Sequence, residues 1–364
     1  MTPLEAIIRE LVIADGPMTI DRFMMLCLAH PRHGYYMARM PFGRQGDFVT
    51  APEVSQIFGE LIGVWCIAAW EVMGRPDPVR LVELGPGRGT LMADLLRACR
   101  IAPAFEAALR IHLVDSSPLL AETQRQTLAA ACQPIDWHAG LDTIPAGPMI
   151  LIANEFFDAI PIRQLQRRDG RWHERVVGID QDGNLGLGLA PDPVDNRLVG
   201  AWAGAAAEGA IAEISPARCQ LAEALGARLS AAPSFALVID YGHLSSAAGD
   251  TLQAVAGHRR ADLLDRPGEV DITAHVDFAA LAACLRRAGA HVYSAMDQGS
   301  FLGAMGLPAR VAALGRGQPP AARAAIAEAA ARLAAAGEMG HLFKVLGAGH
   351  PDLPPPFPFT RGEP

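Results

Sequence analysis

Apolar residues recur along this chain at two different spacings, and the spacing changes near residue 76. Over residues 1–75 they recur every three or four positions, as Leu4, Ile8 and Leu11 do, which predicts helices. Beyond residue 76, short apolar runs alternate with segments of helical periodicity. Strands are predicted at 80–84, 110–115, 135–138, 149–154, 235–240, 291–296 and 342–346. Strands that alternate with helices predict an α/β fold with a Rossmann-like, largely parallel sheet.

Between the fourth and fifth of these strands the pattern is that of antiparallel hairpins. Asp169-Gly170 is a turn dipeptide flanked by alternating polar and apolar residues, and 176–183 repeats the pattern. We therefore predict five regions. They are an N-terminal helical and loop region covering the active site at 1–75, the first part of the Rossmann-like domain at 76–163, an antiparallel insertion with hairpins and a helix at 164–234, the second part of the Rossmann-like domain with a helical insertion at 235–350, and a proline-rich tail, extended or disordered, at 351–364.

Composition narrows the class of protein. Of 364 residues, 51% are apolar and 19% are charged, which is typical of a globular chain. The net charge of −8 gives no basic surface for nucleic acid and suits a cationic or neutral substrate. No uncharged apolar run is long enough to span a membrane, so we expect no stable membrane insertion. Six cysteines without a C-x-x-C pair or zinc-like spacing predict reduced, mostly buried thiols and no metal site.

The sharpest local motif is Glu-Leu-Gly-Pro-Gly-Arg-Gly at 83–89, directly after the first predicted strand. Gly85 and Gly87 would let the backbone approach a ligand closely, and Gly89 would let the next helix pack tightly on the sheet. A glycine loop between a strand and a helix is typical of a site for a nucleotide-type cofactor.

Residues in and near this loop bear on which cofactor binds. Pro86 removes an N–H donor and Glu83 would repel a diphosphate, so the loop fits NAD poorly. The same pair suits S-adenosylmethionine, a cationic sulfonium with an amino-acid tail. Asp115, 30 residues beyond the first glycine, would bind the ribose hydroxyls, with Ser116 beside it; the alternative is that Asp115 caps the next helix. We attribute the long spacing to an extended connection near Pro103.

The fourth predicted strand ends in Asn-Glu-Phe-Phe-Asp-Ala-Ile-Pro at 154–161. Ligands bind beyond the carboxyl ends of the strands in such sheets, so this segment should face the reaction centre. Asn154 would reach the cofactor, and the carboxylates of Glu155 and Asp158 could bind a guanidinium through paired, charge-assisted hydrogen bonds. The alternative is a capped short helix whose phenylalanines lie in the core.

Further candidates lie after the fifth predicted strand. His243 could accept a proton near neutral pH, although such a histidine is more often structural. The long segment 243–272 carries Arg259, Arg260 and Asp271, and His275 follows it. These residues either close over a substrate or form a solvated surface.

Six blocks of the chain together resemble the MidA family. They are Gly-Asp-Phe-Val-Thr-Ala-Pro-Glu-Val-Ser at 46–55, Phe-Gly-Glu at 58–60, the glycine loop at 83–89, the Asn-Glu-Phe-Phe-Asp block at 154–161, Ile-Asp-Tyr-Gly at 239–242 and Val-Asp-Ile-Thr-Ala-His-Val-Asp-Phe at 270–278. The resemblance implies a class I methyltransferase fold that binds S-adenosylmethionine through Glu83, Gly85, Gly87 and Asp115. It also implies methyl transfer to an arginine of a protein partner.

The MidA family includes the mitochondrial arginine methyltransferase that assists assembly of respiratory complex I, which implies a complex I subunit as the partner. This N-terminus lacks a mitochondrial presequence, so we expect a cytoplasmic bacterial member. Glu53, from the first block, would help Glu155 or Asp158 to align the guanidinium. A non-catalytic assembly factor that binds the cofactor, a different methyl acceptor and an NAD-dependent oxidoreductase stay as alternatives, and a homodimer stays open.

Overall fold

The computed structural model describes residues 1–38, 50–257 and 259–360. The first four residues of the 46–55 block, 46–49, lie outside the described residues, so only the part from Thr50 onward is placed below.

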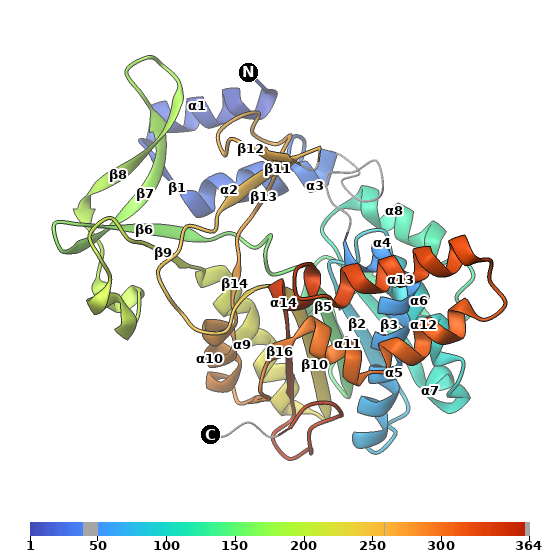
Figure 1. The fold of residues 1–364 in the computed structure, drawn as a ribbon. Coiled ribbons are helices and arrows are strands. Elements are labelled where there is room, and N and C mark those ends of the chain that lie inside the picture. Colours follow the sequence, from blue (N-terminus) through green and yellow to red (C-terminus); the bar gives the residue numbers. More distant parts are fainter. Residues whose placement is uncertain (39–49, 258, 361–364) are drawn as a thin grey trace.

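A central sheet organises the molecule (Figure 1). Its strand order is β15–β17–β10–β5–β2–β3–β4, with β14 beside β10 and β16 beside β17. The bounds are β2 (Val79–Leu84), β3 (Leu109–Val114), β4 (Ile135–His138), β5 (Met149–Asn154), β10 (Ser234–His243), β14 (Val276–Asp277), β15 (His291–Val292), β16 (Met296–Asp297) and β17 (Phe343–Gly349). The run from β4 to β10 is parallel, whereas β17 is antiparallel to β10. The predicted Rossmann-like α/β fold is confirmed, and its strand order reverses between β2 and β5, where such sheets bind ligands.

Helices cover both faces of this sheet. One face packs against α5 (Gln56–Val72), α6 (Thr90–Cys99), α7 (Pro103–Ala108), α11 (Gln298–Ala304), α12 (Leu307–Gly315) and α13 (Pro320–Ala334). The other packs against α9 (Pro216–Ala231) and α10 (Phe278–Arg287). The remaining helices near the sheet are α8 (Pro118–Thr127), α14 (Met339–Leu342) and the short η1 (Leu141–Thr143). Every residue of β5 is therefore buried, as its unbroken apolar run predicts.

A second layer lies over the carboxyl ends of the parallel strands (Figure 1). It contains a sheet of β1 (Met18–Thr19), β6 (Arg163–Arg168), β7 (Arg171–Ile179), β8 (Leu185–Pro193) and β9 (Ile211–Ile214), and a three-stranded sheet of β11 (Gln253–Ala256), β12 (Arg259–Ala261) and β13 (Asp271–Thr273). Its helices are α1 (Pro3–Asp15), α2 (Ile20–Ala29), α3 (Tyr35–Ala38), η2 (Asn196–Leu198) and η3 (Ala201–Ala205). The short helix α4 (Ala51–Val54) instead packs on the central domain beside α5, α6 and α13. Side chains of α1, α2, β7 and β13 share one apolar core, so distant parts of the chain form this layer together.

The first predicted hairpin is confirmed. Asp169 and Gly170 join β6 to β7 with φ angles of 52° and 71°, the left-handed values that a tight two-residue turn needs. The second predicted hairpin joins β7 to β8.

The long spacing between Gly85 and Asp115 arises near Pro103, as predicted, where the short helix α7 is inserted before β3. Pro103 occupies the first helical turn, where it is tolerated, and Phe105 is buried. Two other local predictions are wrong. The predicted strand at 291–296 is two two-residue strands, β15 and β16, both paired with β17. The proline-rich tail packs on the core: Phe359 is only 5% exposed and contacts Trp65 and Tyr293.

The cysteine prediction is wrong for one pair. Cys219 in α9 and Cys284 in α10 form a disulfide with a Cα–Cα distance of 5.5 Å. Their sequence separation of 65 conceals this pairing in the sequence, and only the packing of α9 on α10 brings the two thiols together. No helix among the described residues is long and apolar enough to cross a membrane.

Candidate functional site

The glycine loop leaves β2 and enters α6 in an unusual backbone conformation. Gly85, Gly87 and Gly89 have φ angles of 61°, 52° and 82°, which L-residues seldom adopt. A Cβ on Gly85 would lie 2.6 Å from Cδ2 of Phe156, so the loop also approaches the segment after β5 too closely for a side chain. The loop therefore needs glycine for conformation and for space.

Glu83 lies at the carboxyl end of β2 with its side chain buried. Its Oε2 has no hydrogen-bond partner among the described residues. Burial, followed by the nearby charge of Asp115, raises the pKa of Glu83 to about 8. A buried carboxyl group with a free oxygen at a pocket wall fits a cationic ligand, because a positive charge would stabilise the ionised form.

Asp115 occupies the neighbouring position at the end of β3. Its Oδ1 accepts a hydrogen bond from the backbone N–H of Ser117 at 2.8 Å, and its Oδ2 accepts one from Nε2 of Gln124 at 2.8 Å. The same Gln124 nitrogen donates to the carbonyl of Gly87 at 2.9 Å. Ser117 caps α8, so the alternative that Asp115 caps this helix is wrong. Ser116 is exposed beside it.

A pocket lies at the carboxyl ends of β2 and β5. Seven of the predicted site residues line it, namely Glu53, Glu83, Gly85, Pro86, Gly87, Asn154 and Glu155. Asp115, Ser116, Gly89 and Asp158 lie outside that lining. The pocket therefore joins the glycine loop to the first half of the 154–161 segment, as the sequence predicts.

Asn154 and Glu155 form one wall of this pocket. The Nδ2 of Asn154 donates to Oε1 of Glu155 at 3.0 Å, whereas the buried Oδ1 of Asn154 lacks a partner in the described part of the chain. Glu155 has a φ of 48°, a strained value for a residue with a side chain. Burial raises the pKa of Glu155 to about 7, even though the N–H of Ala51 donates to it. A carboxyl group that titrates near neutrality at a pocket wall is a candidate for proton transfer.

Two carboxylates attach the N-terminal region to this pocket. Glu155 accepts the N–H of Ala51, the first residue of α4, at 2.8 Å. Glu53, in the same short helix, accepts the hydroxyl hydrogen of Thr90 at 2.7 Å and lies 3.7 Å from Arg88. Helix α4 thus lies over the glycine loop, and both predicted residues hold it there.

Asp158 belongs to the same 154–161 segment but does not line the pocket. It is 7% exposed, and burial raises its pKa. Asp240, a fully buried residue of β10, accepts the backbone N–H groups of Phe156, Phe157 and Asp158 at 3.2, 3.0 and 3.1 Å. The capped short helix considered as an alternative is therefore replaced by a turn wrapped around a buried carboxyl group. In the sequence, Asp240 is the last residue of the predicted strand 235–240, which is a signal for a role at the site. The prediction from that region instead concerned His243.

A polar cluster surrounds Asp158 inside the protein. The Tyr241 hydroxyl lies near Asp158 and Thr273, and burial, followed by the charges of Asp158 and Asp240, raises the pKa of Tyr241 well above its usual value. Nevertheless Asp158 Oδ1, the Tyr241 hydroxyl and Thr273 Oγ1 complete no hydrogen bond with a described residue. The Tyr36 hydroxyl donates to Asp271 at 3.0 Å on the far side. Of the long-segment candidates, Asp271 thus belongs to this cluster, whereas Arg259 and Arg260 are exposed on β12.

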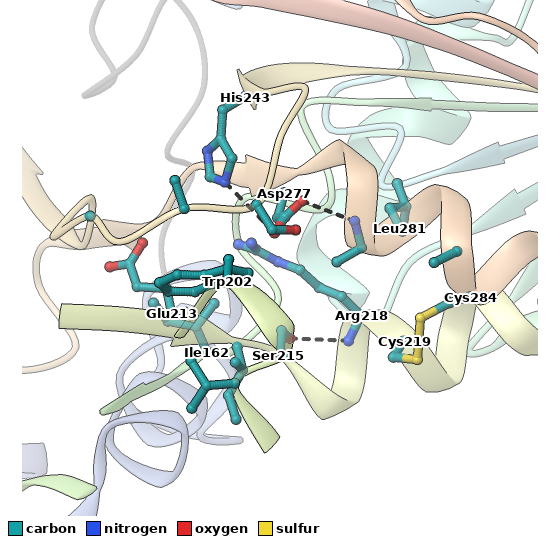
Figure 2. A pocket seen from close by; sticks show the side chains of 18 of the residues that line it. Ile162, Trp202, Glu213, Ser215, Arg218, Cys219, His243, Asp277, Leu281 and Cys284 are labelled. Carbon is teal, nitrogen blue, oxygen red and sulfur yellow. Dashed lines mark hydrogen bonds and ion pairs between the residues drawn. A yellow bond between two sulfur atoms is a disulfide. The ribbon is translucent and has the colours of Figure 1, made fainter. Parts of the chain in front are cut away.

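His243 and His275 line a second, larger pocket of about 770 Å³ between α9, α10 and β9 (Figure 2). His243 lies 3.8 Å from Asp277, the residue that caps α10. The His275 ring contacts the Tyr241 ring at 5.3 Å. Neither histidine lines the pocket at the glycine loop, so His243 is remote from the candidate cofactor site. No cluster of metal-binding side chains occurs within residues 1–38, 50–257 and 259–360.

Comparison with known proteins identifies the family. Residues 61–296 match the model of a family of S-adenosyl-L-methionine-dependent methyltransferases. The chain belongs to this methyltransferase family. A Danio rerio relative, named protein arginine methyltransferase NDUFAF7, mitochondrial, is 34% identical over 92% of this chain and 83% of its own. The Homo sapiens protein of that name is also 34% identical, over 86% and 76%. The resemblance to the MidA family is confirmed.

The cofactor of this methyltransferase is S-adenosylmethionine. A crystal structure of a Burkholderia thailandensis protein with bound S-adenosylhomocysteine is similar, with a TM-score of 0.82, 30% identity, and coverage of 95% of this chain and 92% of the other. The unpartnered, buried oxygens of Glu83 and Asn154 fit such a cofactor, because they offer acceptors to a cationic ligand at a glycine loop.

The comparison with relatives contradicts the expectation of a cytoplasmic bacterial protein. The named relatives are mitochondrial proteins. The prediction rested on the first residues of the chain alone, whereas the similarity to these relatives covers most of it.

Proposed function

We propose that this methyltransferase transfers a methyl group to a guanidinium nitrogen of an arginine in a protein partner. The observation that carries the proposal is the pair of carboxyl groups just after β5, the half-buried Glu155 and the buried Asp158. Glu155 lines the pocket at the glycine loop, and Oδ1 of Asp158 is buried without a hydrogen-bond partner among the described residues. The relatives named above as protein arginine methyltransferases support the same acceptor.

The residues of this chain have distinct roles in the proposal. Glu83, Gly85, Gly87, Asn154 and Asp115 would hold S-adenosylmethionine, with Pro86, Gly89 and Ser116 shaping the loop and strand ends around it. The bound cofactor supplies a methyl group on a positively charged sulfur. Asp158 would bind and orient the guanidinium through charge-assisted hydrogen bonds. Glu155, whose pKa is about 7, would accept the proton that the nitrogen loses when it gains the methyl group.

Glu53 and the N-terminal region have a positioning role in this proposal. The contacts of Glu155 with Ala51 and of Glu53 with Thr90 fasten α4 over the glycine loop. Closure of this kind would exclude water and fix the acceptor, and correct positioning supplies much of the rate in transfers without covalent catalysis.

For the partner we propose a subunit of respiratory complex I. The motif blocks that resemble the MidA family support this choice. It is a more specific proposal than the transfer of a methyl group to arginine. A cofactor-binding assembly factor without turnover is the competing function.

The test incubates the purified protein with methyl-labelled S-adenosylmethionine and purified subunits of respiratory complex I. Mass spectrometry then locates the label. Methylarginine in the wild-type reaction and none with Asp158→Asn would support the proposal. Label on another residue type would refute the acceptor. Tight cofactor binding with no label on any protein would favour the assembly factor.

A further inference from the structure

A basic cluster of Arg80, Arg110 and Arg228 lies at the edge of the central sheet opposite the glycine loop. Arg80, near the amino end of β2, is paired with Arg110 on β3, and paired residues of parallel strands project from the same face of a sheet. Val82, two positions beyond Arg80, belongs to the apolar core under α9 and α10, so both arginines project from that face. Arg228 comes from the last turn of α9.

The loop between η1 and β5 brings the guanidinium groups of Arg80 and Arg228 together. Nη2 of Arg228 donates to the carbonyls of Ile144 and Pro145 at 2.8 and 2.9 Å. Arg80 lies against the same loop, since a Cβ on Gly147 would collide with its Nη1. Burial, followed by the nearby charge of Arg80, lowers the pKa of Arg228. The two cations are therefore close enough to repel each other.

Arg80 has hydrogen-bond donors that the protein leaves unused. Its Nε is buried without a partner in the described part of the chain, and its other side-chain nitrogens donate to no described residue. A buried donor without a partner indicates an acceptor, such as an ion, that belongs beside it. The side chains of Arg80 and Arg228 are only half-buried, so a small anion from solution can reach both guanidinium groups.

The carboxylates of this region do not neutralise the two arginines. Neither Arg80 nor Arg228 forms an ion pair with a described carboxylate, and no acidic group contributes to the pKa shift of Arg228. Asp136, on β4, is 69% exposed and lies 3.8 Å from Nδ1 of His112. Asp142 is exposed on η1. Three guanidinium groups thus face two exposed carboxylates, in a chain whose overall charge is −8.

Two histidines complete the surroundings of the cluster. Nδ1 of His112 lies 2.9 Å from Nε2 of His138, whose Nδ1 lies 2.8 Å from Oγ1 of Thr143. Burial, followed by the charge of His138, lowers the pKa of His112. These rings bond to each other, so the positive charge available to a ligand is that of the arginines.

We propose that Arg80 and Arg228 form a binding site for a phosphate group beside the loop 144–147, with Arg110 at its edge. Two guanidinium groups match the several oxygens and the double charge of a phosphate, whereas a single carboxylate would leave one cation uncompensated. The site lies across the sheet from the glycine loop, so its ligand is distinct from S-adenosylmethionine. The inference is independent of the proposed methyl acceptor.

The test is titration calorimetry of the full chain, with S-adenosylhomocysteine present to fill the cofactor site. Inorganic phosphate, glycerol 3-phosphate and acetate are the probes. Similar affinities for the two phosphates would assign the site to the free ion, and tighter binding of glycerol 3-phosphate would assign it to a phosphate ester. Both results support the proposal. No binding of either phosphate, or acetate that binds as tightly, would overturn it.

Variants locate the bound phosphate. Arg80→Gln and Arg228→Gln should each weaken phosphate binding about tenfold, because each removes a charged donor. Arg80→Gln breaks no hydrogen bond to a described residue, so this variant should fold. The control is Arg22→Gln, which removes the same charge from an arginine paired with Asp15 on α2, in the layer over the carboxyl ends of the strands (Figure 1). Equal weakening in the control would refute the site, since net charge alone would explain it.

Asp136→Asn supplies a variant in which binding should improve. It removes an exposed negative charge beside the cluster and should tighten phosphate binding about threefold, a gain that misfolding cannot produce. Phosphate should also raise the Tm of the wild type more than that of Arg80→Gln, because a ligand stabilises the folded state that binds it. Unchanged phosphate affinity in both Asp136→Asn and Arg80→Gln would refute the assignment.

Discussion

Replacing Glu83 with Gln should have opposite effects on cofactor binding and on the stability of the cofactor-free protein. Glu83 is 3% exposed, and burial together with Asp115 raises its pKa from 4.5 to about 8. The folded protein therefore holds this proton more tightly than the unfolded chain does. The associated stability is complete below pH 4.5 and is lost as the pH rises toward 8.

The magnitude follows from the difference between the two pKa values of Glu83. Between pH 4.5 and about 8, each rise of one pH unit lowers the unfolding free energy by about 1.4 kcal/mol. Near pH 8 the folded protein also begins to ionise, so the total loss from pH 6 to 8 is about 2 kcal/mol. Glu83→Gln cannot ionise and should lack this loss. For cofactor binding the sign reverses, because a cationic ligand favours the ionised carboxylate. Wild-type affinity should then rise nearly tenfold from pH 6 to 7, and the variant should show no such rise.

The assay combines chemical denaturation of the cofactor-free protein at pH 6 and 8 with calorimetric titration of S-adenosylmethionine at pH 6 and 7. That window keeps an amino group of the ligand protonated, since its ordinary pKa is about 7.7 to 8.0. We expect weaker binding, no rise in affinity with pH, and a smaller loss of stability for Glu83→Gln. A variant that keeps the wild-type dependence of affinity on pH would refute the role of Glu83 at the cofactor site.

Three further predictions test other parts of the site. Asp158→Asn should leave the Kd for S-adenosylmethionine within about twofold but lower kcat by about 100-fold or more, because the amide cannot accept charge-assisted bonds on both atoms; unchanged turnover would remove Asp158 from the acceptor site. Gly87→Val should abolish detectable cofactor binding, since a β-branched residue is strained at a φ of 52°, and a normal Kd in a folded variant would contradict the loop assignment. Cys219→Ser should lower the unfolding free energy by up to about 4 kcal/mol, from the 65-residue separation of Cys219 and Cys284, and a reductant should lower the Tm of the wild type but not of the variant.

Local sequence patterns were sufficient where a residue's role depends on its own strand or turn. The all-buried run of β5 and the turn at Asp169-Gly170 are examples, because burial on two faces and left-handed φ angles leave direct marks on residue choice. The glycine loop is another: its conformation is reserved for glycine, and its place after β2 brings it to the carboxyl edge of the sheet. The same reasoning placed Glu83, Asn154 and Glu155 at one pocket.

Only the tertiary structure decided the contacts between segments that are far apart in the chain. Gln124 in α8 joins Asp115 to Gly87, and a glutamine in a helix gives no sign of this in sequence. Asp240 holds the loop before Asp158 from a neighbouring strand, and Arg218 holds the same loop from α9. These pairings depend on which strands and helices become neighbours, and that follows from packing whole apolar faces together rather than from the pattern of any one segment.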